Sequence, residues 1–309
     1  SGWKLERDTG DIEVNSGLFR GDITVRGDIS FTNDSHTSAL VGGPFGHIDS
    51  SGTINSYLDG AGLYVFVMVG GGGAGTRSDT DETSHTAGGG GGGGCAIFSF
   101  DWDGSTTLSF ARGSGGIWSG GNALAGSAST FSYGGSIIAT AGGGAGAPNY
   151  QSTGTASGGT VSFNAGVVTL LANIARTGGS AAVTSGGQVC AGAGVSFFGD
   201  NGGNTTSSQS ANVGGSPYGQ PPSTSDTRLI MNLNRTFGFI GGAGAATGDP
   251  QASVTAGVGG LFSGGGSVRS NGSGVAGNGG IGGGGGGARC DSSRTSGVGG
   301  PGGLFWSKL

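Results

Sequence analysis

Short apolar runs alternate with runs of glycine along most of the chain. The apolar runs have the length of β-strands, and the longest uninterrupted one, Leu63–Val69, is followed directly by Gly70–Gly73. Similar runs lie between later glycine-rich segments, at Ala96–Phe100, Thr106–Phe110, Ser136–Thr140, Val161–Ile174 and Arg228–Ile240. Runs of this length, bounded by glycine, predict a chain that is mostly β and irregular, with essentially no α-helix.

The glycine segments show two arrangements. Gly88–Gly94 and Gly282–Gly287 are unbroken, whereas Val298, Pro301 and Leu304 are each separated by two glycines, which is a Gly-Gly-X period of three. Three residues per turn is the period of the polyproline-II helix, whose N–H and C=O groups have no partners within the helix. Because glycine has no side chain, neighbouring helices can approach and bond main chain to main chain. We therefore predict a packed bundle of polyglycine-II helices with flanking β-strands and end loops.

Composition separates this prediction from two other glycine-rich classes. The chain has 309 residues, including 79 glycines but only 7 prolines, and its unbroken glycine runs exclude the Gly-X-Y repeat of collagen. Hydrophobic residues make up 33% and charged residues only 10%, which is too apolar for a typical disordered chain. The glycines expected to form the bundle are Gly70, Gly71, Gly72, Gly73, Gly88, Gly91, Gly94, Gly142, Gly143, Gly282, Gly285, Gly299, Gly300, Gly302 and Gly303.

The first 50 residues follow a different pattern, with sparser glycine and short alternating segments. Trp3–Leu5 and Ile12–Val14 are the first of these segments, and Gly-Asp-Ile recurs from residues 10, 21 and 27, where Gly-Asp supplies a turn. Strands this short cannot bury a core within one chain. We expect residues 1–50 to form a β-rich stalk that associates as a homotrimer, and residues 51–309 to form the glycine-rich domain.

Net charge and residue spacing exclude several kinds of partner and cofactor. The net charge is −5 and the 13 cations are scattered, so the chain lacks the basic cluster that nucleic acids require. No apolar stretch approaches the roughly 20 residues that cross a bilayer. Cys95, Cys190 and Cys290 lie far apart without metal-binding spacing, which favours reduced thiols and neither a metal nor another cofactor.

One carboxylate pair has a spacing that catalysis could use. Asp101 and Asp103 would share a strand face at a separation near that of inverting glycosidases. The same residues, followed by Gly104, also match a turn that caps a hairpin. We favour the turn and expect no catalytic residue.

Two regions resemble bacteriophage proteins. Tyr64–Gly75, followed by Gly88–Gly94 and Gly299–Trp306, resembles the glycine-rich receptor-binding domain of phage tail fibres, whose T-even members carry a polyglycine-II sandwich with host-contacting loops. Gly2–Val14 with Arg20–Ile23 is similar to the C-terminal region of lambda-like host-specificity (tail tip attachment) proteins, which implies a trimer. Together the resemblances imply the host-facing piece of a central tail fibre, located at the distal end of the virion's tail and assembled in the host cytoplasm. T-even adhesins are separate chains, whereas here stalk and adhesin are fused.

Long polar loops are the candidate receptor contacts. Residues 76–87 are polar and too long for a simple turn, and such loops on rigid scaffolds tend to carry function, although a solvated loop without a partner is the alternative. Tyr150 and Tyr218 are amphipathic anchors. Trp118 suits either a binding hot spot or the flank of the bundle, and we favour the flank. The expected receptor contacts are Arg77, Asp79, Glu82, His85, Asn149, Tyr150, Tyr218, Gln220, Arg289 and Arg294.

Three classes of function are consistent with these features. A receptor-binding protein without enzymatic activity ranks first, and a capsule or lipopolysaccharide depolymerase ranks second. A polyglycine-II structural or ice-binding protein ranks third, because the outward residues vary among Val, Asn, Ile, Pro and Leu. The acidic net charge disfavours a highly anionic polysaccharide. We therefore expect the receptor to be a host outer-membrane protein rather than lipopolysaccharide, with no nucleic-acid partner and no membrane insertion.

Overall fold

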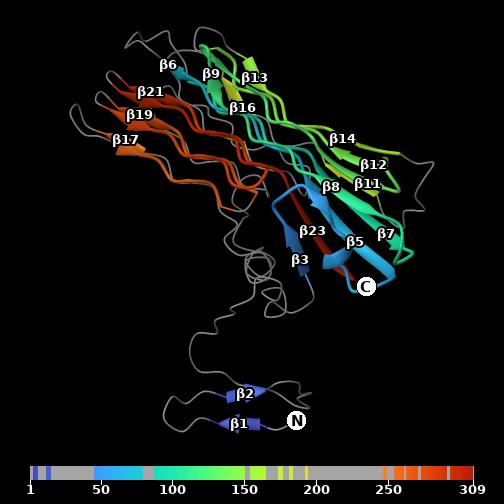
Figure 1. Ribbon diagram of the computed structural model, residues 1–309. Helices are drawn as coiled ribbons and strands as arrows, with labels where there is room; N and C mark the ends of the chain where they lie inside the picture. Colours follow the sequence, from blue (N-terminus) through green and yellow to red (C-terminus); the bar gives the residue numbers. More distant parts are fainter. Residues whose placement is uncertain are drawn as a thin grey trace, which may run out of the picture. The chain divides into compact units, whose positions relative to one another are not determined.

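The chain divides into two compact units, Ser1–Thr37 and Ser38–Leu309. The computed structural model describes residues 3–5, 12–14, 45–78, 87–149, 154–164, 173–176, 181–183, 192–193, 246–248, 254–260, 262–270, 273–290 and 293–308. Over these residues the structure is mostly β, with no α-helix and with several antiparallel sheets around a buried aromatic cluster (Figure 1).

The first unit contains one antiparallel strand pair within its described residues. β1 (Trp3–Leu5) and β2 (Ile12–Val14) pair with Trp3 opposite Val14 and Leu5 opposite Ile12, so both segments are the strands that the sequence predicts. The remaining short strands expected before residue 37 lie outside the described residues. β3 (Phe45–Ile48) belongs to the second unit, although the boundary expected at residue 50 would place it in the stalk. The trimeric state of the stalk stays a prediction.

Two five-stranded antiparallel sheets form the second unit's apolar core. The first has the order β15-β7-β5-β23-β3, with β15 at Asn173–Arg176, β7 at Cys95–Trp102, β5 at Gly62–Val69 and β23 at Gly303–Lys308. The second has the order β14-β12-β11-β8-β4, with β14 at Val161–Phe163, β12 at Ser136–Ala141, β11 at Ser129–Tyr133, β8 at Leu108–Ala111 and β4 at Gly52–Thr53. A single 3₁₀ turn, η2 (Asn55–Tyr57), follows β4. We call these two sheets the sandwich.

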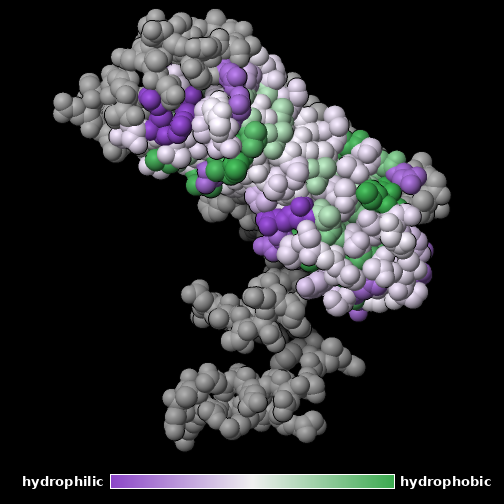
Figure 2. Space-filling view, turned by 45° about the horizontal axis from the view of Figure 1, so that its top comes forward, coloured by the Kyte–Doolittle hydropathy of each residue, from purple (hydrophilic) through white to green (hydrophobic). Residues whose placement is uncertain are grey.

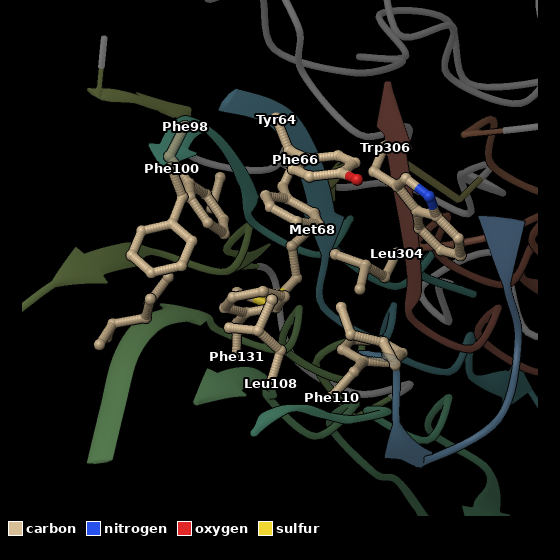
Figure 3. Packing of buried hydrophobic residues seen from close by; sticks show 14 of the residues in the cluster. Tyr64, Phe66, Met68, Phe98, Phe100, Leu108, Phe110, Phe131, Leu304 and Trp306 are labelled. Carbon is tan, nitrogen blue, oxygen red and sulfur yellow. The ribbon is translucent and has the colours of Figure 1, made fainter. Parts of the chain in front are cut away.

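Alternation along β5 builds the interior of the sandwich. Tyr64, Phe66 and Met68 are buried, while the intervening valines are only partly buried. The ring of Phe66 lies 4.7 Å from that of Phe131 in the second sheet and 5.4 Å from that of Phe98 in β7, measured between centroids. Figure 3 shows side chains of β5, β7 and β23 meeting those of β8 and β11. Burial of these large apolar side chains stabilises the pairing of the two sheets.

Most strands of the sandwich continue directly into glycine segments. β5 leads into residues 70–76, and residues 88–94 lead back into β7. Residues 113–117 follow β8, and 124–128 precede β11. In the same way, 142–147 follow β12, 157–160 precede β14, and 297–302 precede β23. Because neighbouring strands of the sandwich are antiparallel, the glycine segments run alternately away from it and back to it.

Main-chain hydrogen bonds with a period of three join the glycine segments. Along residues 70–76, successive N–H groups donate in rotation to the carbonyls of three segments, 88–94, 124–127 and 297–300, at N···O distances of 2.8–3.0 Å. Every third donor therefore points to the same neighbour, so that Gly70, Gly73 and Thr76 all bond to residues 88–94. Glycine-to-glycine main-chain bonding, which the sequence predicts, is present.

The carbonyl groups of residues 70–76 bond to three further segments. These are residues 113–117, 142–147 and 282–287, through bonds from Gly116 to Gly72, from Gly144 to Gly71 and from Gly285 to Gly73 at 2.8–2.9 Å. Residues 70–76 are therefore surrounded by hydrogen-bonded neighbours on every side. Ordering glycine costs more backbone entropy than ordering any other residue, and this dense bonding offsets that cost. We call the bonded set of glycine segments the lattice.

The lattice leaves no space for a side chain at many of its positions, although Ala74 and Thr76 are buried within it. A Cβ added at Gly73 would lie 1.9 Å from the carbonyl oxygen of Ala145, and one at Gly143 would lie 2.0 Å from that of Gly126. These separations are far below van der Waals contact, so only glycine is compatible with the observed approach of the main chains. Gly303 differs from the other glycines expected in the bundle, because it is the first residue of β23 and pairs with Val69.

A repeated unit builds the C-terminal part of the lattice. β18 (Val254–Thr255), β20 (Gly274–Val275) and β22 (Arg294–Thr295) pair in parallel, with Val254, Gly274 and Arg294 in one register. A second parallel sheet has the order β17-β19-β21-β6, with β17 at Ala246–Gly248, β19 at Val268–Ser270, β21 at Ala288–Cys290 and β6 at Arg77–Ser78. Residues 257–260 and 277–280 follow β18 and β20, and 263–267 and 282–287 lead back to β19 and β21, whereas 297–302 after β22 continue into β23.

The close approach at Gly73 leads to a test of the lattice. We expect Gly73→Ala to lower the free energy of unfolding by about 3 kcal/mol, because the new methyl group meets main chain that cannot rotate aside. Gly52→Ala is the matched control, since a Cβ there has nothing within 4 Å, and we expect its stability to be unchanged or raised by about 0.5 kcal/mol. Denaturant unfolding followed by circular dichroism measures both. Equal stability of the two variants would contradict the close packing.

Candidate functional site

The lattice has the sandwich at one end and short strands with loops at the other. Residues 70–76 run from β5 to β6, and residues 113–117 run from β8 to β9 (Trp118–Ser119). β10 (Asn122–Ala123) and β13 (Gly154–Ala156) begin the segments that return to β11 and β14, and β13 pairs with β16 (Ala181–Val183). Figure 1 shows these strands together with β17, β19 and β21, away from the sandwich. We call this the loop end.

Four of the expected receptor contacts lie at the loop end. Arg77 is in β6, where it pairs with Ala288, and Arg289 is in the neighbouring strand β21. Arg294 is in β22 and is half-buried, while Asn149 follows the segment 142–147 and is exposed. The side chain of Arg289 is only 6% exposed, so little of it is available for direct contact. The other expected contacts, Asp79, Glu82, His85, Tyr150, Tyr218 and Gln220, lie outside the described residues.

Trp118 also lies at the loop end. It is part of a hairpin and does not simply lie on the flank of the bundle, which was the favoured expectation. β9 and β10 pair with Trp118 opposite Ala123, and the connecting residues Gly120 and Gly121 have φ values of +57° and +86°. Positive φ at both central positions is the geometry of the tight turns that suit hairpins, and glycine adopts it without strain. The guanidinium carbon of Arg77 lies 5.5 Å from the centre of the Trp118 ring. The hairpin therefore holds an indole against an arginine.

The guanidinium of Arg77 is held without a charged partner among the described residues. Its Nε atom is buried and has no hydrogen-bond acceptor there. The indole of Trp118 supplies a cation–π contact, which is worth about 0.5–2 kcal/mol depending on solvent exposure. A buried donor without an acceptor is unfavourable, and positions of this kind require a specific explanation.

Exposed aliphatic side chains lie on the lattice flank beside this hairpin. Ile117 is 51% exposed, Leu124 44% and Val298 38%. The N–H of Leu124 donates to the carbonyl of Ile117 at 3.0 Å. The N–H of Gly299, which follows Val298, donates at 2.9 Å to the carbonyl of Gly116, which precedes Ile117. These three side chains therefore come from adjacent segments. Figure 2 shows apolar and strongly polar residues in separate small patches on a surface of intermediate hydropathy.

Asp103 caps a turn, as favoured from the sequence, whereas Asp101 lies within β7. One carboxylate oxygen of Asp103 accepts bonds from the N–H groups of Ser105 and Thr106 at 2.8 and 2.7 Å, and the other accepts from the hydroxyl groups of Thr106 and Tyr133 at 2.5 and 3.0 Å. Gly104 has a φ of +80°. Both oxygens of Asp103 are thus engaged in the turn that joins β7 to β8, at the sandwich end. Because β7 and β8 belong to different sheets, this turn does not close the hairpin that the sequence suggested.

Shifted pKa values among the described residues occur in the sandwich. Desolvation lowers the pKa of His47, which stacks on Phe305 with centroids 4.5 Å apart, and desolvation raises the pKa of Tyr64. The side-chain hydrogen bond from Thr106, followed by bonds from main-chain N–H groups, lowers the pKa of Asp103. Each shift has a structural cause, and none of the three groups faces the loop end.

Within the described parts of the chain, no group of three or more His, Cys, Asp or Glu residues is arranged to hold a metal ion. The same parts contain no helix long and apolar enough to span a bilayer. Cys95 is buried and forms no disulfide. Comparison with protein-family models gives no match, and comparison with curated proteins gives none either.

Asp103 allows the turn to be tested by pH. Because its pKa is lowered in the folded state, it stabilises the fold above its ordinary pKa of about 3.9, and this contribution is lost as the pH falls through the lowered value. We expect Asp103→Asn to lower the melting temperature at pH 7, and the difference from the wild type to shrink below about pH 4. Thermal unfolding at several pH values measures this. A constant difference across that range would contradict the assignment.

Proposed function

We propose that the chain is the host-facing, receptor-binding part of a bacteriophage tail fibre. In this proposal the lattice is a polyglycine-II bundle that acts as a rigid support, and the loop end contacts a receptor on the outer membrane of the host. The stalk formed by the N-terminal residues holds three copies together. The chain acts by binding and has no enzymatic activity.

The observation that carries the proposal is the rotation of hydrogen bonds along residues 70–76. Successive N–H groups address three neighbouring segments in turn, which requires a threefold main chain packed among similar chains. This is the arrangement expected of the phage adhesins that the sequence resembles. The support also comes from the position of the loops, since Arg77, Asn149 and Arg294 share one end of the lattice.

The alternative of a polysaccharide depolymerase has less support. The best carboxylate pair in the sequence has Asp103 engaged by Ser105, Thr106 and Tyr133 in a turn. A general acid or base needs a carboxyl group that can exchange its proton near neutral pH, whereas the pKa of Asp103 is lowered away from that range. A purely binding role is therefore the better account of the described residues.

The proposed function can be tested with the full chain on intact bacteria. We expect the labelled chain to bind cells of particular Gram-negative strains and to protect those strains from a tail-fibred phage when added first. Mild protease treatment of the cells should remove binding if the receptor is a protein, whereas purified lipopolysaccharide should not compete. Chain that has been irreversibly heat-denatured is the control.

Three outcomes would contradict the proposal or a part of it. Binding to lipopolysaccharide alone would overturn the choice of a protein receptor. Release of reducing sugar from capsule or lipopolysaccharide during the incubation would support the depolymerase. Failure to bind any strain in a broad panel would remove the receptor-binding function itself.

The trimeric stalk can be tested separately. We expect multi-angle light scattering to give a mass about three times the 29.4 kDa of one chain. Removal of residues 1–37, which form a separate compact unit, should convert the trimer into monomers with the sandwich intact. A monomer at micromolar concentration for the full chain would overturn this part of the proposal.

A further inference from the structure

We propose that Arg77 and Trp118, together with Ile117, Leu124 and Val298, form an anchor site for a carboxylate-bearing loop of a protein receptor. This inference rests on the proposed function and specifies the chemistry of its contact. Arg77 would bind a carboxylate of the partner, and the three aliphatic residues would cover apolar side chains beside that carboxylate. We call these five residues the corner site.

Arg77 is positioned in advance for such a contact. Its guanidinium lies 5.5 Å from the Trp118 ring centre, and its Nε is already shielded from water without an acceptor among the described residues. Part of the desolvation cost of binding is therefore incurred before the partner arrives. The planar guanidinium and the rigid indole also lose little freedom on binding, which raises the affinity that each contact gives.

Charge complementarity favours a carboxylate as the group that Arg77 binds. Among the described acidic side chains of the second unit, Asp49, Asp59 and Asp103 lie next to strands at the sandwich end, and Asp101 lies within β7 of the sandwich. Arginine and carboxylate form paired, charge-assisted hydrogen bonds that are roughly twice as strong as neutral ones. A carboxylate from another molecule would pair with the guanidinium of Arg77, whose side chain is only partly buried.

The aliphatic residues favour a protein over a polysaccharide as the partner. Ile117, Leu124 and Val298 expose 51%, 44% and 38% of their surface on neighbouring segments. Hydroxyl-rich sugar surfaces would lose hydration against these side chains without gaining hydrogen bonds, whereas apolar side chains of a protein loop would gain contact area. Arg and Trp are also the residue types most enriched in protein–protein hot spots. Arg289 in the neighbouring strand is only 6% exposed, so the corner site itself presents one cation rather than the clustered cations that bind phosphate groups.

A small probe tests the corner site without knowledge of the host. We would titrate the full chain with a blocked Leu-Asp dipeptide and follow the Nε–H signal of Arg77 and the indole N–H signal of Trp118 by NMR. The matched control is Arg112, whose Nε–H already donates to the carbonyl of Gly302 at 3.0 Å. The blocked Leu-Asn dipeptide and inorganic phosphate are the control ligands.

We expect the Leu-Asp dipeptide to shift the Arg77 and Trp118 signals together, while Arg112 stays unchanged. The Leu-Asn dipeptide should bind about tenfold more weakly, because it lacks the charge. Absence of a shift at Arg77 would overturn the proposal. An equal or stronger response to inorganic phosphate would overturn the assignment to a protein carboxylate and identify a general anion site.

Adsorption to cells then separates this proposal from the proposed function. For a strain that binds the full chain, we expect Arg77→Ala and Trp118→Ala to weaken binding about 30-fold each, as at a hot spot. Arg77→Lys keeps the charge but removes the paired N–H donors of the planar guanidinium, and we expect an intermediate loss of binding. Ile137→Ala is the matched control, since Ile137 is also 51% exposed but lies in β12 of the sandwich.

Melting temperatures of all variants show whether each is folded. If Trp118→Ala is unstable, the binding of Arg77→Lys to cells is compared with that of the wild type in its place. Wild-type adsorption by folded Arg77 and Trp118 variants would overturn the corner site while leaving the receptor-binding function in place. Loss of adsorption by Ile137→Ala as well would also overturn it, because the contact would then not be confined to the loop end.

Discussion

Main-chain hydrogen bonding between glycine segments is the interaction on which the rest of the second unit depends. Residues 70–76 satisfy their N–H groups on three neighbours and several carbonyls on three more, so the segment is enclosed by other main chains. At positions such as Gly73 this enclosure leaves no room for a Cβ, and the segment accommodates only the small side chains of Ala74 and Thr76. Variable side chains are therefore confined to the flank and the two ends of the lattice. The position of any binding site follows from this confinement.

The sandwich gives the glycine segments their direction and order. A glycine segment carries no side chains that could distinguish one neighbour from another, so its register must be set elsewhere. The paired strands β5 and β7, with Phe66 and Phe98 stacked at 5.4 Å, fix the points from which residues 70–76 leave and to which residues 88–94 return. Antiparallel pairing in the sandwich therefore places the connecting loops together at the opposite end. Specific aromatic packing determines the layout of a lattice that has little specificity of its own.

Much of this arrangement could be predicted from local sequence, and the remainder could not for physical reasons. The apolar run Leu63–Val69 lies within β5, and the Asp-Gly turn at Asp103 is present because a carboxylate two or three residues before free N–H groups caps them. The hairpin that carries Trp118 was not predicted, since Gly120-Gly121 resembles the surrounding lattice glycines although it forms a hairpin turn. The signal was available: a glycine pair followed by Asn is typical of a tight turn. The parallel register of Val254, Gly274 and Arg294 was also hidden, because glycine bias obscures repeats.

In the proposed function, support and recognition are physically separate, and this separation bears on how the chain would bind. Gly120 and Gly121 have open space around the position of a Cβ, whereas Gly73 and Gly143 have none. Substitutions or insertions near the β9–β10 hairpin thus leave the inner bonds of the lattice untouched, while a single methyl group inside it does not. A scaffold with these properties holds surface residues such as Arg77 and Trp118 in place and tolerates their replacement. Receptor recognition by a phage requires both properties, since the contact must be rigid enough to bind and variable enough to follow changes in the host surface.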